Sequence, residues 1–308
     1  MSVACKCDEG ISSLFVGGCN GLVDITARAI FLERFTSTGT RNFLDVSAVP
    51  VPASVFTAAF KNVDATKRFH ITPELMNPTW VPNEDNLQTF DGGQIAKLSD
   101  GTTTLTFMVI NVSPQEAANY KKLECGKNDV MLVTESGQLI GYASPEDIDA
   151  GRLYGLPVQN ITVLATPSKT NASVSNVMIT LTLSKTLNLA HIVTVASADM
   201  LVDLLTVAEP KNAVLTATTP TTTLVVVNVA SEYYGINGAL PIEGLGIADF
   251  KLTELPSTAV TALTVTETAA GTYSITYAAL SSADVLRIEL DPASSINYLG
   301  NSVEVTIP

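Results

Sequence analysis

Residues Gly271–Tyr277, with the sequence GTYSITY, alternate between large apolar and small polar side chains. Two tyrosines and an isoleucine occupy every second position, and hydroxyl side chains stand between them. Successive side chains of an extended strand point to opposite faces of a sheet, so this stretch predicts a β-strand with one buried and one hydrated face. Residues Val303–Ile307 repeat the alternation at the end of the sequence.

Outward from this stretch, the same alternation predicts a run of short strands that begins near Lys211. Glu209-Pro210 and Thr218-Thr219-Pro220 mark the boundary before it. The predicted strands are Leu224–Val229, Asp249–Leu255, Ala262–Glu267, Gly271–Ala278, Val285–Leu290 and Ser302–Ile307. Short strands spaced about ten residues apart are typical of a β-sandwich.

The part before this boundary is also predicted to be mainly β, as a β-sandwich or barrel with one or two short helices. Its predicted hairpins pair Gly93–Ser99 with Thr102–Asn111 around Ser99-Asp100-Gly101, and Asn128–Thr134 with Gln138–Ala143 around Glu135-Ser136-Gly137. Val158–Thr166 and Ser175–Ser184 are further predicted strands, whereas Thr26–Phe35 and Val55–Asn62 leave the type of element open. Residues 66–95 contain three prolines and Trp80, and predict a long connection that either reaches a neighbouring subunit or meanders over the surface.

Three serines predict helix starts. Ser113-Pro114-Gln115-Glu116 and Ser144-Pro145-Glu146-Asp147 have the spacing of a capping box with proline at the first helical position. The first helix is predicted to end near Cys125, with Gly126 in a left-handed conformation. Ser197-Ala198-Asp199-Met200 predicts a third short helix, through Leu205.

The composition favours an assembled or binding protein. The chain has 308 residues, which suggests about two domains, 1–209 and 210–308. Charged residues make up 15%, well below the roughly 25% typical of soluble domains. Such a surface is either covered by a partner or kept soluble by threonine and serine. The net charge of −13 disfavours sequence-independent nucleic-acid binding, and it suits both ordinary solubility and a wall past which DNA slides.

No export or membrane segment is expected. The apolar run Leu224–Val227 is far shorter than the about 20 residues that a spanning helix needs. Val16-Gly17-Gly18-Cys19 has the form of a lipoprotein cleavage site, but Asp8 and Glu9 stand where such a leader is basic, and the apolar stretch Ile11–Val16 is too short.

No catalytic, cofactor or metal site is predicted. His70 and His191 are isolated between apolar neighbours, and the adjacent carboxylates Glu84/Asp85 and Glu146/Asp147 diverge on regular structure. Asn83-Glu84-Asp85-Asn86 is dense in the oxygens that calcium prefers but lacks the spacing of an EF-hand, so a solvated turn is the default. Cys5, Cys7, Cys19 and Cys125 are expected to be free thiols, with zinc or disulfide pairing as the alternatives.

Residues 210–308 resemble the bacterial immunoglobulin-like domains of phage virions and cell-surface proteins. The resemblance rests on Gly271–Tyr277 and on Asp284–Leu290, DVLRIEL. Residues 1–205 look like structural proteins of phages that infect Bacteroidetes, through the Cys5-Lys6-Cys7 start, the region Gly93–Ala143, and Val177–Leu183 leading into Ala196–Asp199. Their order of elements is also similar to the phage tail-tube fold.

The resemblance implies a virion structural protein and not an enzyme. A tail-tube subunit that forms stacked, hexameric rings is the first expectation, with other virion proteins as further partners and DNA passing without sticking. The arm Gly10–Asp24 and the segment Thr66–Ile95 would bridge subunits, and the immunoglobulin-like domain would face outward and touch glycans or the host surface weakly. A capsid-decorating or head-completion protein and a bacterial surface adhesin remain as alternatives.

Overall fold

The structure is a computed structural model that describes residues 25–308 apart from 63, 84–85, 90–94, 100, 167–174, 186, 189–190, 219, 232–238 and 293–296, and only the backbone of 86–89 and 95–99. Strands predominate and the helices are few and short, which confirms the mainly β prediction. The chain divides into two compact units, Met1–Glu209 (unit 1) and Pro210–Pro308 (unit 2). The predicted arm Gly10–Asp24 lies outside the described residues.

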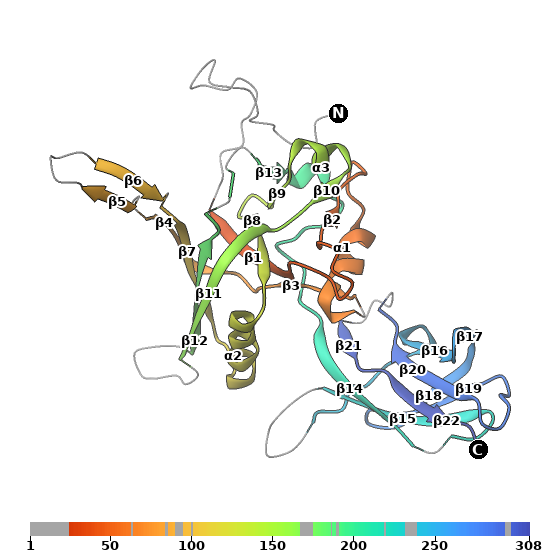
Figure 1. Cartoon of the computed structure of the whole chain (residues 1–308). Helices are drawn as coiled ribbons and strands as arrows, with labels where there is room; N and C mark the ends of the chain where they lie inside the picture. Colours follow the sequence, from red (N-terminus) through yellow and green to blue (C-terminus); the bar gives the residue numbers. More distant parts are fainter. Residues whose placement is uncertain are drawn as a thin grey trace. The chain divides into compact units, whose positions relative to one another are not determined.

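In its described residues, unit 1 combines many strands with three short α-helices (Figure 1). Its strands are β1 (Thr26–Glu33), β2 (Leu44–Asp45), β3 (Phe69–Ile71), β4 (Met76–Pro82), β5 (Asn86–Thr89), β6 (Ile95–Ser99), β7 (Thr103–Ile110), β8 (Asn128–Thr134), β9 (Leu139–Tyr142), β10 (Arg152–Leu153), β11 (Leu156–Thr166), β12 (Asn176–Leu183) and β13 (Ile192–Val195). Its helices are α1 (Ala53–Phe60), α2 (Pro114–Lys121) and α3 (Pro145–Asp149).

The largest sheet of unit 1 has the strand order β13-β9-β8-β11-β12-β7-β4, and β1 pairs with both β8 and β3. β1 is buried on both faces, which explains why its sequence lacks a clean alternation. Phe31 belongs to one hydrophobic core and its neighbours Ile30 and Leu32 to a second. A central strand between two cores needs apolar residues at every position, so periodicity alone could not determine its type.

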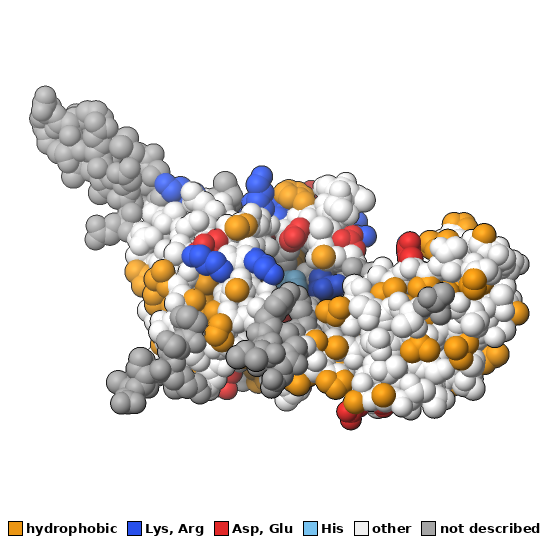
Figure 2. Space-filling view, turned by 90° about the horizontal axis from the view of Figure 1, so that it is seen from below, with side chains coloured by type: hydrophobic (Ala, Val, Ile, Leu, Met, Phe, Trp, Pro, Cys, Tyr) orange, Lys and Arg blue, Asp and Glu red, His pale blue; other side chains and the backbone are white. Residues whose placement is uncertain are grey.

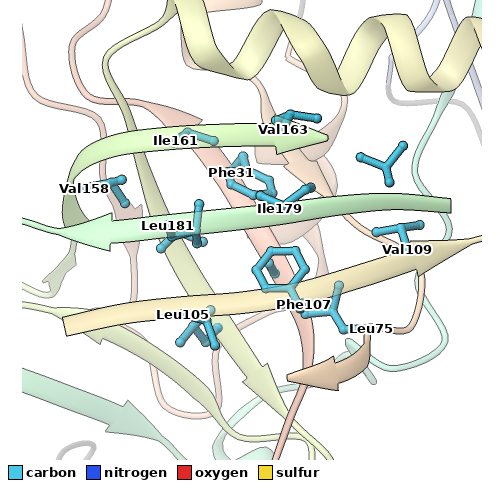
Figure 3. Close-up of a cluster of buried hydrophobic side chains, with 14 of the residues drawn as sticks. Phe31, Leu75, Leu105, Phe107, Val109, Val158, Ile161, Val163, Ile179 and Leu181 are labelled. Atoms are coloured by element: carbon cyan, nitrogen blue, oxygen red, sulfur yellow. The ribbon is translucent and has the colours of Figure 1, made fainter. Parts of the chain in front are cut away.

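The first core lies between β1, β8 and the inner face of β7, β11 and β12 (Figure 3). Phe107, Ile179 and Leu181 are completely buried there. The predicted face of β12 is confirmed, because its burial alternates along the strand with Val177, Ile179, Leu181 and Leu183 inside. The second core is covered by α1, through Phe56 and Phe60.

The prediction of a structureless connection over residues 66–95 is wrong for the described residues. β4 pairs antiparallel with β7, and β5 pairs with β6, so the two strand pairs form one long hairpin. The predicted pairing of Gly93–Ser99 with Thr102–Asn111 is therefore wrong as well. β4 is an edge strand, where Pro78 and Pro82 are tolerated because no outer neighbour needs the amide hydrogen that proline lacks. Figure 1 shows β5 and β6 projecting beyond β4 and β7.

The predicted hairpin around Glu135-Ser136-Gly137 is confirmed as β8 and β9, and both predicted capping boxes are present. Gly126, however, is extended (φ −96°) and not left-handed. The last turn after α2 tightens into a 3₁₀ helix, Lys122–Cys125, and the Asn128 side chain donates a hydrogen bond to the Leu123 carbonyl (3.0 Å). This amide supplies the helix-end contact that a left-handed glycine would otherwise make.

The third predicted helix is reduced to a 3₁₀ turn, Ser197–Asp199. The residues that follow are held by Arg28 of β1. The guanidinium of Arg28 is buried and donates hydrogen bonds to the carbonyls of Thr72 (2.6 Å), Leu204 (2.7 Å), Leu205 (3.1 Å) and Val207 (2.6 Å). These carbonyls point at the cation and are thus not available for helical hydrogen bonds.

Replacing Arg28 with methionine is expected to lower the free energy of unfolding of unit 1 by about 3 kcal/mol, because several buried carbonyls lose their donor at once. Arg28→Lys should be intermediate, since an ammonium keeps the charge but cannot span the same carbonyls. Urea unfolding followed by tryptophan fluorescence measures both, since Trp80 is the one tryptophan of the chain and lies in unit 1. A methionine variant as stable as the wild type would contradict this role.

Unit 2 is a sandwich of two sheets. Its strands are β14 (Lys211–Ala217), β15 (Leu224–Ser231), β16 (Phe250–Glu254), β17 (Thr258–Val260), β18 (Ala262–Ala269), β19 (Thr272–Tyr277), β20 (Val285–Leu290), β21 (Tyr298–Gly300) and β22 (Val303–Thr306). One sheet has the order β18-β19-β15-β14-β21 and the other β17-β16-β20-β22, and the unit's core contains residues of both. The six predicted strands are all present; β14, β17 and β21 were not predicted.

The tyrosines of Gly271–Tyr277 anchor loops as well as the core. Tyr273 is fully buried, and its hydroxyl donates to the Ile242 carbonyl (2.7 Å) and accepts from the Leu245 amide (3.2 Å). Glu267 accepts hydrogen bonds from the amides of Gly244 and Gly271, both at 3.0 Å. These backbone hydrogen bonds lower the pKa of the Glu267 carboxyl.

Glu267→Gln is expected to lower the melting temperature of the chain at neutral pH, with a smaller difference in acid. A carboxyl whose folded-state pKa is depressed contributes stability above its unfolded value, near 4.5, and loses it as the pH falls through the folded value. Calorimetry between pH 3 and pH 7 tests this, with Glu243→Gln as the matched control. A pH-independent difference between wild type and Glu267→Gln would sink the assignment.

Candidate functional site

The outer face of the sheet formed by β11, β12, β7 and β4 carries no ionisable side chain. Because burial alternates along β7, β11 and β12, every second side chain of these strands points away from the first core, and the register of β4 against β7 extends the same face onto β4. The residues of this surface, which we call the unit 1 face, are Asn160, Thr162, Leu164, Thr166, Asn176, Met178, Thr180, Thr182, Thr104, Thr106, Met108, Ile110, Met76, Thr79 and Val81.

The strand register arranges the unit 1 face in rows that cross the four strands. One row is apolar and consists of long side chains: Leu164, Met178, Met108 and Met76. The adjacent row consists of threonines: Thr162, Thr180, Thr106 and Thr79. The hydroxyls of Thr106 and Thr180 lie 3.2 Å apart and are hydrogen-bonded to each other.

Unit 2 has a second surface of the same kind, on the outer side of its five-stranded sheet. We call it the unit 2 face; its residues are Val214, Thr216, Leu224, Val226, Asn228, Ala230, Thr272, Ser274, Thr276, Thr264 and Thr266. Thr264 and Thr276 share a hydrogen bond of 2.6 Å between their hydroxyls, and Thr272 donates to Asn228 (2.8 Å). Charged side chains are again absent from these positions.

A hydrated sheet face ordinarily carries charged residues between its threonines, because they keep the surface soluble and block association. Here both faces exclude them although the chain carries 47 side chains of Lys, Arg, Asp or Glu in all. Figure 2 shows one side of the molecule, on which charged groups are scattered among broad white and orange areas. Uncharged faces that mix hydroxyl and apolar groups are suited to burial against another protein surface.

A buried carboxylate of β8 in unit 1 organises a group of arginines and aromatic rings. Asp129 is 1% exposed and lies 2.8 Å from Arg34 and 3.4 Å from Arg41. The guanidinium of Arg41 also stacks on Tyr154, 4.3 Å from the ring centroid. Phe43 packs edge-on against Tyr154 and is itself covered by Arg152. This group fixes the segment after β1 against β8.

An open hollow of about 470 Å³ lies beside this group, between α1 and the segment that precedes it. Residues that line it include Thr36, Arg41, Phe43, Ala58, Ala59 and Lys67. Hydroxyl, cationic and aliphatic groups thus share its walls, and this mixture selects no single class of ligand. The hollow belongs to the Arg41 group by position, because Arg41 and Phe43 form part of both.

The two histidines have different partners in the part of the chain that the structure describes. His70 is exposed and contacts Glu209 at 2.9 Å, and His191 lies 3.3 Å from the Tyr142 hydroxyl. Asp147 caps α3, which accounts for one member of the Glu146/Asp147 pair. In the described residues, no three side chains of His, Cys, Asp or Glu come together as a metal site.

Some candidates fall outside the described residues, namely Cys5, Cys7, Cys19, Glu84 and Asp85. Cys125 is described, and it is an exposed free thiol. Asn83 bonds across the β4–β7 hairpin to Thr102, from its amide nitrogen to the carbonyl and from its side chain to the hydroxyl. In the part of the chain that the structure describes, no helix has the length and hydropathy to cross a bilayer.

The unit 1 face was not found from the sequence, because its strands had to be paired before its rows could be seen. The signal was present in the alternating pattern of Val177–Leu183. The positions between its buried residues contain threonine and methionine but no charged residue. A prediction of β7 and β12 as neighbours would have aligned Met108 with Met178, as the structure does.

Comparison with known proteins yields little. No protein-family model matches the chain, and no curated protein matches it. Among solved structures, the Bacteroides ovatus mixed-linkage glucan utilization locus protein SGBP-B in complex with a mixed-linkage heptasaccharide aligns at 10% identity, with a TM-score of 0.19. The alignment covers 78% of this chain and 62% of that one, so this chain spans less than two thirds of its length. At this TM-score the likeness supports no conclusion about fold or function.

Asp129→Asn is expected to lower the free energy of unfolding by about 3 kcal/mol, because it leaves the arginines that face it without a buried anion. Asp64→Asn is the control: Asp64 pairs with Lys67 at 3.7 Å on the surface, and asparagine keeps the hydrogen bond that Asp64 accepts from the Thr66 amide, so the loss of the charge should change stability little. Chemical denaturation of both variants provides the comparison. Equal stability of Asp129→Asn and wild type would show that Arg34 and Arg41 are held by their other contacts instead, the Val158 carbonyl and the ring of Tyr154.

Proposed function

We propose that this protein is a structural protein that assembles with copies of itself. The observation that supports this proposal is the pair of uncharged faces, one on each unit. Assembly is their simplest use, because a face without charge can be buried without leaving an unpaired ion in the contact. No chemical step on a substrate is part of the proposal.

The charge of the chain favours contact at these faces over contact elsewhere. Each copy carries a net charge of −13, so two copies repel each other wherever their carboxylates approach. At the uncharged faces this repulsion is smallest, and the burial of Leu164, Met178 and Met108 adds a favourable hydrophobic contribution. The charge pattern therefore favours contact between copies at the uncharged faces and disfavours contact at the acidic parts of the surface.

More specifically, we propose that this protein is a virion structural protein. Its most specific form is a tail-tube subunit in a ring that is expected to be hexameric. The support is the resemblance of residues 1–205 and 210–308 to phage structural and immunoglobulin-like domains, together with the projecting β5–β6 hairpin, which has the reach to contact a neighbour. The acidic chain would let DNA pass through such a tube without binding it. A capsid-decorating protein or a surface adhesin would use the same faces in smaller assemblies.

Wild-type protein is expected to form oligomers whose mass rises with concentration, visible by mass photometry and as rings or tubes by negative-stain electron microscopy. Thr180→Lys places a charge at the centre of the unit 1 face and should weaken association about tenfold or more, because the ammonium loses its hydration on contact. Thr57→Lys adds the same charge at an exposed position of α1 and should leave association unchanged. A wild type that stays monomeric at high concentration, both alone and beside other virion proteins, refutes the proposal.

A further inference from the structure

Resting on the proposed function, we infer that copies associate head to tail, with the unit 1 face of one copy packed against the unit 2 face of the next. This assigns both surfaces to one contact and names its occupant, a second copy of this chain. The inference depends on the shapes of the faces, on their hydroxyl networks and on their size.

The two faces differ in the size of their side chains. The unit 1 face carries a ridge of long, adaptable groups formed by Leu164, Met178, Met108 and Met76, of which Leu164 is 55% exposed. The unit 2 face consists mainly of short or β-branched groups such as Ala230, Val226, Ser274 and Thr276. A face with large side chains interdigitates with a face of small side chains. Two faces with ridges, or two flat faces, pack less well against each other.

The hydroxyl groups of both faces are already partly satisfied by one another. Thr106 bonds to Thr180 in the unit 1 face, and Thr264 bonds to Thr276 in the unit 2 face. Covering a polar group is costly mainly when it loses its hydrogen-bond partner along with its water. Because these pairs keep their partners within the same face, burying them costs less than burying isolated hydroxyls.

The size of the faces fits a weak contact that gains stability when it is repeated around a ring. Four strands at a spacing of about 4.8 Å and about seven residues at about 3.4 Å each give roughly 450 Å² per face. Packing two such faces buries about 900 Å², which is below the about 1,200–2,000 Å² of stable specific interfaces and in the range of weak contacts, so a single contact is reversible. A subunit that uses both of its faces has two such contacts, so a closed ring, in which every face is covered, is more stable than an isolated pair.

Head-to-tail contact has a consequence that self-pairing of either face lacks. A heterologous contact generates a ring if the rotation between copies closes, and an open filament if it does not. Two different faces also permit complementation: a copy with a defective unit 1 face can still offer its unit 2 face to a copy with the opposite defect.

The test uses two variants of the full chain, Thr180→Lys in the unit 1 face and Ser274→Lys in the unit 2 face. Thr180 lies between Thr106 and Thr162, and Ser274 lies between Val226 and Thr266, so each charge enters the middle of its face. Each variant alone is expected to be monomeric. Their equimolar mixture is expected to form a one-to-one dimer and nothing larger, detected by mass photometry with one variant carrying a mass tag.

Circular dichroism and thermal unfolding check that both variants fold. Thr162→Lys and Thr266→Lys, at exposed positions of the same faces, serve as a second pair if either central variant does not. Thr57→Lys mixed with Ser274→Lys is the control for the mixture, because its two faces are intact and it should form longer oligomers.

Three outcomes overturn the head-to-tail arrangement while leaving self-assembly in place: homodimers of either variant alone, an unchanged oligomer in either variant, or a mixture that stays monomeric although the wild type assembles. Homodimers of Ser274→Lys would show that the unit 1 face pairs with itself, and homodimers of Thr180→Lys that the unit 2 face does. A wild type that stays monomeric at high concentration, both alone and beside other virion proteins, refutes the proposed function and this inference together.

Discussion

The register of β7 against β12 is the constraint on which most of unit 1 depends. Met108 stands opposite Met178, and Phe107 stands opposite Ile179, so a single pairing places the aromatic and aliphatic side chains inside and the uncharged groups outside. A slip of one residue would exchange the two faces, moving threonines into the core and Phe107 into solvent. The first core and the unit 1 face are thus two results of the same register, and selection on either one maintains the other.

Buried charges hold the segments that the sheets do not. Arg28 draws the carbonyls of Leu204, Leu205 and Val207 onto β1, and Asp129 draws Arg34 and Arg41 onto β8. These segments lie outside the strands, and a buried ion with several partners gives each of them one defined position. Desolvation lowers the pKa of Arg28, yet an arginine stays protonated at any pH at which the protein folds, so the anchor is permanent.

The sequence predicted the elements whose signals are local. The capping boxes at Ser113 and Ser144, the turn at Gly137 and the alternation of Gly271–Tyr277 each depend on neighbours within a few residues. Elements that depend on distant partners were missed. Residues 76–82 form a strand because β7 lies beside them, the chain near Leu205 is not helical because Arg28 takes its carbonyls, and the uncharged faces emerge only once strands are paired. No local pattern carries that information.

Threonine gives both faces a balance that a purely aliphatic surface would lack. A sheet face of leucine and valine would associate before folding was complete, and a face of lysine and glutamate would not associate at all. Threonine favours the strand through its branched side chain, keeps the free subunit hydrated through its hydroxyl, and can bond to a neighbouring threonine when water leaves, as Thr106 and Thr180 do. The acidic groups outside the faces then set the orientation in which copies approach. A surface of this design stays soluble as a monomer and becomes adhesive only toward a matching face.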